Sequence, residues 1–529
     1  MQTFFFCGYF LKFAFYIPPV VMEQDNSLKS SRIARNTLML YVRMFVLMLV
    51  GLYASRVVLN SLGENDFGIY NVVGGVVAMF TIISGALNSA VSRFITFEMG
   101  KGSAGQLNKV YSTAVTIQLM LALIVVVFAE PIGLWFIENK MTIDPVRIPA
   151  AKWVLHFSLL AFVINLMSVP QMASITAHEK MSAYAYIGIM DGLLRLGVAF
   201  LILRSPIDRL IYYAALMAAV VLLVRMAYGL YCRLHFPECR YRPVFDRSLM
   251  KEMFSFAGWN FIGVTSGVLR DHGGNILVNL FSGPAVNAAR GVAVQLNGAV
   301  QGFVTNFMTA VNPQITKSYA EGDMDYLFPL LRRSSRMSFY LLFMIALPVI
   351  FNTEYLMQIW LKEVPEHSAL FVKLFLVFAL SESLSNPLIT AMLATGRIRN
   401  YQLAVGGLQL LNVPVSYVCL KMGAAPEVTV VVAIAISQIC FFVRLFMLRR
   451  MIGLDMGRYV REVYLNVLAT AAVALIVPML TCLHMPESFW RFCLSVAVCV
   501  ISASVAIAFV GCRKDERKAM VNFIKKKKA

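Results

Sequence analysis

The chain has 529 residues, of which 59% are hydrophobic and 14% charged, and its mean hydropathy is +0.71. These values exclude an ordinary soluble protein and are typical of a polytopic helical membrane protein. The formal net charge of +19 does not indicate a nucleic-acid partner, because the basic residues gather in short loops and in the tail.

Residues 1–21 are apolar and rich in aromatic side chains, but they lack the small-residue cleavage site of a signal peptide. If this segment crossed the membrane, Lys29, Arg32 and Arg35 would lie outside, against the charge bias of the later loops. We therefore predict that residues 1–21 do not span the membrane. The polar stretch that begins at Met22 looks like the natural start of the chain.

From Thr37 onward, fourteen apolar segments are long enough, at about 20 residues each, to cross a hydrocarbon core of about 30 Å. They predict an all-α polytopic membrane protein with about 14 transmembrane helices. The segments lie at 37–59, 68–97, 109–129, 151–170, 183–203, 210–230, 253–281, 288–312, 336–351, 369–392, 401–420, 428–447, 463–482 and 490–510.

The loop charges predict the orientation of these spans. With residues 22–36 in the cytoplasm, the loops and the two ends place 29 lysines and arginines on the cytoplasmic side and 7 on the other. This asymmetry indicates that both termini are cytoplasmic. The longest outside connection, 130–150, has no signature of a folded domain.

An internal repeat predicts two lobes. An offset of 220 residues pairs Gly63 with Gly283 and Gly102 with Gly322, at equivalent ends of equivalent spans. We expect two parallel six-helix lobes and two C-terminal helices. The expected parts are an N-terminal segment 1–36, a first lobe 37–230, a cytoplasmic linker 231–252, a second lobe 253–447, two helices in 448–510 and a basic cytoplasmic tail 511–529.

Several arginines fall inside the predicted spans. Arg270 is the most central, and a charge near the bilayer centre costs roughly 2.5–3.5 kcal/mol unless it faces protein or a wet cavity. Arg43 and Arg93 toward the inside, and Arg56 and Arg290 toward the outside, would complete a ladder of cations. Guanidinium forks bind phosphate, so this ladder favours a diphosphate substrate that crosses the membrane.

Arg43 and Arg56 also have a simpler interpretation, because both lie near enough to a membrane interface to extend toward it. They are thirteen positions apart and hence roughly opposite on an ideal helix. Both can face one cavity only if the helix bends, and we expect that bend near Gly51.

The predicted span 288–312 has one polar face. Its five polar residues fall within about 80° of arc on an ideal helix. This face predicts a cavity lining, whereas bonding between helices is the alternative. The residues are Arg290, Asn297, Gln301, Thr305 and Asn312.

The acidic residues inside the spans have different expected roles. Asp191 and Arg195 are four positions apart and should neutralise each other, and Asp271 could hold a neighbouring arginine. Glu382 has no basic neighbour in its own helix. Glu382 and Asp271 are therefore candidates for ion coupling, although an arginine on another helix could pair with Glu382 instead.

We expect no catalytic site, metal or cofactor. The sequence has no P-loop, no paired carboxylates in an outer loop and no serine or cysteine set beside a base. Its nine cysteines are scattered without the spacing of a metal or disulfide framework.

Four stretches carry a resemblance to a known family. They are Arg35 to Thr37, Ser55 to Gly63, Asp66 to Gly75 and Phe281 to Gly291. They resemble the Wzx-type polysaccharide and O-antigen flippases of the multidrug/oligosaccharidyl-lipid/polysaccharide (MOP) exporter superfamily. The resemblance covers essentially the whole chain from Met22.

The resemblance implies a MATE-like fold in the bacterial inner membrane and a flippase for undecaprenyl-diphosphate-linked oligosaccharide in surface polysaccharide or lipopolysaccharide synthesis. It implies that Arg43, Arg56 and Arg93, with Arg270 or Arg290 as counterpart in the second lobe, line a cationic cavity. We expect the protein to be a monomer that contacts membrane lipids and other polysaccharide-assembly proteins. We expect no nucleic-acid partner.

Two rival functions remain at this point. A cation-coupled multidrug exporter of the same superfamily would carry an acidic cation site in its first lobe, where only Asp191 is deep. An integral-membrane polysaccharide polymerase would need a larger outside loop with catalytic residues.

Overall fold

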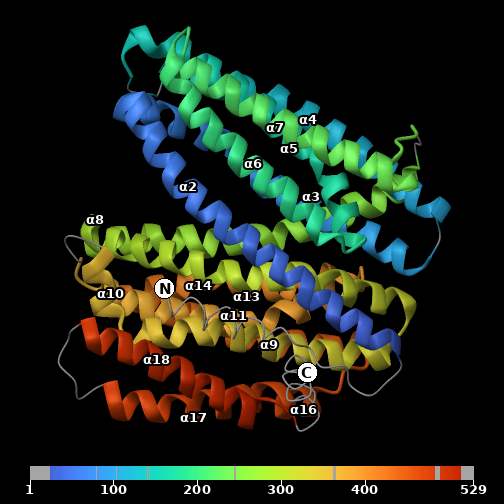
Figure 1. Cartoon of the computed structure of the whole chain (residues 1–529), viewed down its shortest axis with the longest axis vertical. Coiled ribbons are helices and arrows are strands. Elements are labelled where there is room, and N and C mark those ends of the chain that lie inside the picture. Colours follow the sequence, from blue (N-terminus) through green and yellow to red (C-terminus); the bar gives the residue numbers. More distant parts are fainter. Residues whose placement is uncertain are drawn as a thin grey trace, which may run out of the picture. The chain divides into compact units, whose positions relative to one another are not determined.

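In the computed structural model, the described residues are 24–78, 80–102, 104–139, 141, 143–243, 246–360, 365–482, 489–513 and 517. Their regular secondary structure is entirely helical (Figure 1), which confirms the all-α fold class. The segment 1–21 and most of the tail 511–529 lie outside the described residues.

The chain forms two compact units. Among the described residues, the N-terminal unit comprises those in 39–261, and the C-terminal unit comprises 24–38 and those that follow 261. Both boundaries fall inside long helices, α2 (Gln24–Ala78) and α8 (Arg247–Glu321), whereas the predicted seam was the linker 231–252.

The N-terminal unit is built around α5, which packs against α3, α4, α6 and α7. Asp208 begins α7 by accepting hydrogen bonds from the N–H groups of Leu210 and Ile211. Beyond α2 and the start of α8, its elements are α3 (Thr81–Gly100), α4 (Ala104–Asn139), η1 (Pro145–Arg147), α5 (Ile148–Ala177), α6 (Met181–Leu201), η2 (Ile202–Arg204), α7 (Arg209–His235) and η3 (Pro237–Cys239).

In the C-terminal unit, α9 and α11 are the most buried of the apolar helices, and α11 packs against both α9 and α15. Its elements after α8 are α9 (Met324–Phe351), α10 (Thr353–Trp360), α11 (Ser368–Ala394), α12 (Arg399–Tyr401), η4 (Gln402–Gly406), α13 (Gly407–Leu410), α14 (Asn412–Lys421), α15 (Val428–Ile452), α16 (Met456–Tyr459), η5 (Val460–Tyr464), α17 (Leu465–Cys482), α18 (Phe489–Ala506) and η6 (Ile507–Gly511).

Two glycines interrupt the longest helices. Gly63 breaks α2 with φ 79° and ψ 167°, and Gly283 breaks α8 with φ 82° and ψ 176°. This backbone region is essentially restricted to glycine. The bend expected near Gly51 is therefore wrong: Gly51 keeps helical geometry, and the break comes after both Arg43 and Arg56.

Within the described residues, eleven helices are long and apolar enough to cross a membrane. The predicted count of 14 is therefore not confirmed. The predicted spans that are not among the eleven are 68–97, 253–281 and 288–312. The last two contain Arg270 and Arg290. Polar side chains therefore lie in helical segments that are less apolar than the eleven candidate spans.

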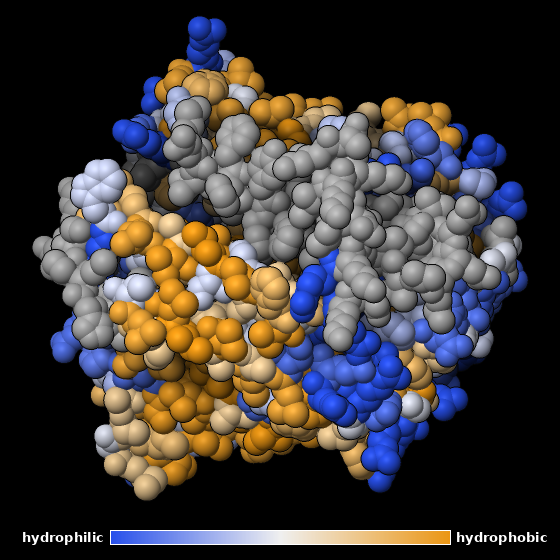
Figure 2. Space-filling model, turned by 60° about the horizontal axis from the view of Figure 1, so that its bottom comes forward, coloured by the Kyte–Doolittle hydropathy of each residue, from blue (hydrophilic) through white to orange (hydrophobic). Residues whose placement is uncertain are grey.

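The two C-terminal helices have a surface suited to lipid. α17 and α18 pack against each other, and α18 also packs on α9. Large apolar side chains on both helices are exposed, including Leu480, Trp490 and Phe509. Figure 2 shows a broad hydrophobic area on the face that carries these helices in Figure 1. Exposing such a large apolar surface to water is unfavourable, so this surface fits contact with lipid acyl chains.

Candidate functional site

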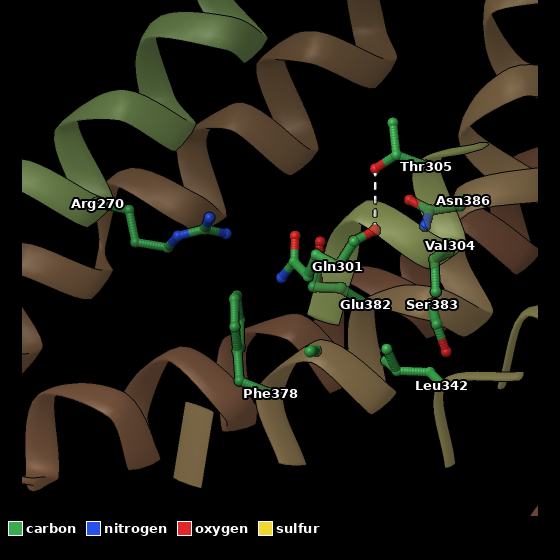
Figure 3. Close-up of a pocket in the computed structure, with 10 residues that line it drawn as sticks. Arg270, Gln301, Val304, Thr305, Leu342, Phe378, Glu382, Ser383 and Asn386 are labelled. Atoms are coloured by element: carbon green, nitrogen blue, oxygen red, sulfur yellow. Dashed lines mark hydrogen bonds between the residues drawn. The ribbon is translucent and has the colours of Figure 1, made fainter. Parts of the chain in front are cut away.

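A pocket opens within the C-terminal unit, between α9, α11 and the two limbs of α8, which lie before and after the break at Gly283 (Figure 3). Its free volume is about 110 Å³, smaller than the roughly 300–1,000 Å³ of typical small-ligand pockets. Polar side chains converge on it from separate elements. The lining residues are Arg270, Gln301, Val304, Thr305, Leu342, Phe378, Ala379, Glu382, Ser383 and Asn386.

Arg270 supplies the positive charge of this pocket. Its guanidinium carbon lies 4.9 Å from the ring centroid of Phe378, over the ring. Its Nε also donates to Asp271 Oδ1 at 2.9 Å. In Figure 3 the guanidinium points toward Gln301. A phosphate group in the pocket would therefore contact a guanidinium whose orientation is already fixed by Phe378 and Asp271.

Arg290 lies outside the pocket lining and joins the two limbs of α8. It is 4% exposed, donates to the Asn275 side chain, and donates through Nη2 to the Asp271 carbonyl oxygen at 3.2 Å. Its guanidinium carbon is 5.4 Å from the ring centroid of Phe375. A Cβ at Gly274 would approach Arg290 Nη2 to 2.7 Å, so this glycine leaves room for the arginine.

Glu382 faces the pocket from α11 and is held from α15. Ser437 donates to Glu382 Oε1 and lies 2.9 Å from the Ser381 hydroxyl. Arg270 and Arg444 both interact electrostatically with Glu382. Glu382 is accessible from the pocket, which it shares with Arg270.

The polar residues on the second limb of α8 have different surroundings. Gln301 and Thr305 line the pocket. Asn312 accepts a hydrogen bond from Thr390 Oγ1 at 2.8 Å, so this end of the face bonds to α11. Asn297 lies outside the lining, and within the described part of the chain no group donates to its buried Oδ1.

The three arginines predicted for the first lobe lie in the N-terminal unit in three environments. Arg43 stacks over the ring of Tyr184, 4.6 Å from its centroid. Arg93 lies among aromatic rings, 4.4 Å from the centroid of Phe97 and 5.8 Å from that of Phe256. Arg56 is exposed.

The pairing predicted for Asp191 and Arg195 is confirmed, since Arg195 Nε donates to Asp191 Oδ1 at 2.9 Å. This pair is local to α6, as its i, i+4 spacing indicates.

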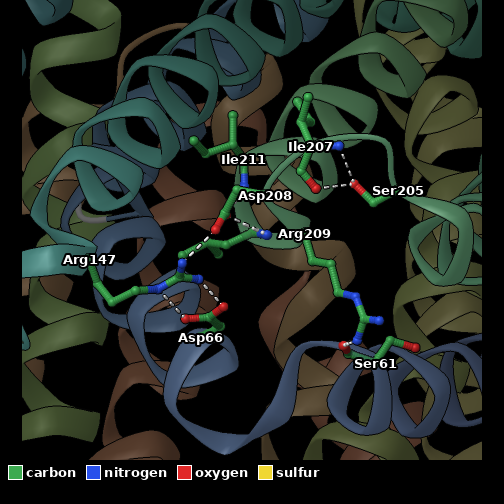
Figure 4. Close-up of polar contacts among 9 residues, drawn as sticks. Ser61, Asp66, Arg147, Ser205, Ile207, Asp208, Arg209 and Ile211 are labelled. Atoms are coloured by element: carbon green, nitrogen blue, oxygen red, sulfur yellow. Dashed lines mark hydrogen bonds and ion pairs between the residues drawn. The ribbon is translucent and has the colours of Figure 1, made fainter.

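An ion network in the N-terminal unit was not anticipated from the sequence (Figure 4). Arg147 binds both oxygens of Asp66 and lies 2.5 Å from Asp208 Oδ2. Burial raises the pKa of Asp208, but the hydrogen bonds from Arg147 and from the N–H groups of Ile211 and Leu210, together with the charge of Arg147, outweigh burial and hold the pKa below its usual value. Arg209 donates to the Ser61 carbonyl oxygen at 3.1 Å, beside the break at Gly63.

Residues 33–319 match the model of a protein family described as "Polysaccharide biosynthesis protein". The match covers more than half of the chain. The protein belongs to this Wzx-like flippase family. No curated protein matches the chain.

Solved structures of MOP-superfamily transporters share the fold of this family member. A MATE transporter in complex with MaL6 matches with a TM-score of 0.70 at 12% identity, covering 84% of this chain and 98% of that one. A MOP-superfamily transporter from Pyrococcus furiosus, described as having a binding pocket of reverse polarity, matches with 0.67 at 12% identity, covering 85% and 98%.

Family and fold together are those of a membrane transporter of the MOP superfamily, not of an enzyme. The identity to the solved structures is low, so they establish the MATE-like fold alone.

Proposed function

We propose that this polysaccharide biosynthesis family member is a flippase that moves undecaprenyl-diphosphate-linked oligosaccharide from the cytoplasmic to the outer leaflet of the bacterial inner membrane. The observation that carries the proposal is the pocket cation Arg270, which lines one pocket with the amide and hydroxyl groups of Gln301, Thr305 and Asn386. Guanidinium suits the diphosphate, and the amides and hydroxyls suit sugar.

The proposed mechanism is alternating access. Arginines hold the diphosphate, the oligosaccharide occupies the wet interior, and the polyprenyl chain stays in lipid throughout. The protein then needs to shield only the polar headgroup, because the tail never leaves hydrocarbon. Arg43, Arg56, Arg93, Arg290 and Asn297 are the further residues that we propose for the headgroup path.

We propose Glu382 as the coupling site, with Asp271 as the second candidate. Glu382 shares the pocket with Arg270, so an anionic substrate and an ionised Glu382 disfavour each other. Protonation of Glu382, or binding of a cation beside it, would relieve this repulsion. In this scheme a proton or sodium gradient drives the cycle.

Surface polysaccharide synthesis is the proposed process, with both termini cytoplasmic and a monomer as the working unit. The other polysaccharide-assembly proteins would supply and consume the lipid-linked substrate. The chain needs no nucleic acid, metal or cofactor for this role.

A cation-coupled multidrug exporter is the second candidate, because the matched solved structures include a multidrug resistance MATE family transporter. Arg270 argues against a cationic drug in this pocket, since like charges repel at short range.

The decisive experiment measures lipid-linked oligosaccharide translocation in vesicles with and without a proton or sodium gradient. We expect Arg270→Ala to abolish translocation and to fail to restore surface polysaccharide export in a strain that lacks the gene. Lys373→Ala, on α11 like Glu382 but half-exposed beside Glu354, should retain both activities. Normal export by a folded Arg270→Ala protein would overturn the proposal.

A further inference from the structure

Asp271, the next residue in the chain, is the hydrogen-bonded counter-ion of Arg270. Arg270 Nε and Nη2 lie 2.9 Å and 3.4 Å from the two carboxylate oxygens of Asp271. The two side chains differ in exposure: that of Arg270 is 16% exposed and that of Asp271 is 61% exposed. The protein therefore encloses the cation and leaves its counter-ion largely uncovered.

Arg270 and Asp271 also have different surroundings. Arg270 lines the pocket and points toward Gln301, whereas Asp271 is not part of the lining (Figure 3). Because Nε and Nη2 form one edge of the guanidinium, Asp271 covers that edge. The terminal edge, with Nη1, is left for a ligand in the pocket.

Arg290 hydrogen-bonds the main chain of Asp271, while its charge acts on the Asp271 carboxylate only at longer range. Its Nη2 donates to the Asp271 carbonyl oxygen, and its Nη1 donates to the Asn275 side chain one turn later. A change in the Asp271 side chain therefore leaves the backbone under Arg270 held in place. The carboxylate can turn away from Arg270 by side-chain rotation alone.

We propose that Asp271 is an internal competitor of the substrate diphosphate and sets how tightly Arg270 holds it. This inference rests on the proposed function and assigns a regulatory role within the same site. Carboxylate and phosphate bind guanidinium with the same planar geometry, so each weakens the hold of the other. A transport site must release what it binds, and an attenuated cation favours release.

The first test is binding of farnesyl diphosphate to the purified full chain in lipid nanodiscs. We expect Asp271→Asn to lower the Kd about tenfold, since an uncompensated guanidinium attracts the diphosphate more strongly. Asp191→Asn is the matched control, because Asp191 accepts from Arg195 Nε at the same 2.9 Å and lies in the other unit. It should leave the Kd unchanged.

The second test is transport kinetics with lipid-linked oligosaccharide in vesicles. Asp271→Asn should lower both KM and the turnover number, because the substrate binds more tightly and leaves more slowly. A merely structural role for Asp271 would instead raise the Kd or leave it unchanged. Asp271→Ser, a second neutral variant, replaces Asp271→Asn if the latter does not yield folded protein.

The outcomes separate this inference from the function on which it rests. If Arg270→Gln loses binding while neutral variants of Asp271 bind no more tightly than the wild type, Asp271 is not a competitor and the diphosphate site stands. If wild type does not bind farnesyl diphosphate, or Arg270→Gln binds as well as wild type, the proposed diphosphate site fails and this inference fails with it.

Discussion

Gly63 and Gly283 lie 220 positions apart and break two long helices with nearly the same backbone angles, φ 79° and 82°. Gly102 and Gly322, also 220 positions apart, end the following helical stretches with φ 74° and 76°. The repeat inferred from a few identities therefore extends to local backbone conformation. In both units, the same glycine positions set where a long helix changes direction.

The first prediction concerns Gly283. Gly283→Ala should lower stability by about 1–3 kcal/mol, because a side chain strains this backbone conformation even though the space around it is open. Gly298→Ala, at an uncrowded helical position of α8, should be neutral or stabilising. Thermal unfolding in detergent compares the two, and equal melting temperatures would contradict the role of Gly283.

The second prediction concerns Arg147. Arg147→Gln leaves the carboxylates of Asp66 and Asp208 without their shared cation, so the melting temperature should fall clearly. Lys152→Gln removes a more exposed pair with Glu138 and should change stability by less than about 1 kcal/mol. If both variants melt alike, the network contributes little to the N-terminal unit.

The third prediction is a pH dependence at Asp208. Its pKa is lower in the folded protein, so the unfolded chain binds more protons around the usual aspartate pKa of about 3.9 and stability rises with pH there. The advantage of wild type over Asp208→Asn should be complete near neutral pH and disappear as pH falls through the depressed pKa. Asparagine can still cap α7, so this comparison isolates the charge. A pH-independent difference in melting temperature would contradict the assignment.

The fourth prediction concerns the space beside Arg290. Gly274→Ala places a methyl group 2.7 Å from Arg290 Nη2, and the guanidinium must shift away from Asn275. We expect a lower melting temperature and weaker farnesyl diphosphate binding. Gly267→Ala, where nothing lies within 4 Å of the added carbon, should match wild type in both measurements.

The sequence predicted the elements of the candidate site that stand out chemically. Arg270, Gln301 and Glu382 are polar residues inside predicted spans, and all three line one pocket. Phe378 was not predicted, because a phenylalanine is unremarkable in a membrane helix until an arginine lies over it. The sequence could not predict that meeting, since it depends on how α11 packs on α8.

The helix bend shows a similar limit. Gly51 and Gly63 lie in the same helix, but only Gly63 has a positive φ. Hydropathy alone does not show which of two glycines in a helix leaves the helical conformation. The Asp66–Arg147–Asp208 network was also missed, because its members come from three separate loops or helix ends. The local pair Asp191–Arg195 needed only helical spacing and was predicted correctly.

The contact between Arg209 and Ser61 has a consequence for biogenesis. The break at Gly63 frees a main-chain carbonyl, and its partner lies 148 positions later in the chain. During translation, Ser61 leaves the ribosome long before α7 is made, so we expect the turn of α2 to mature only once α7 has been inserted. Nascent chains truncated before Arg209 should accordingly be more sensitive to proteases at this turn than chains that include α7.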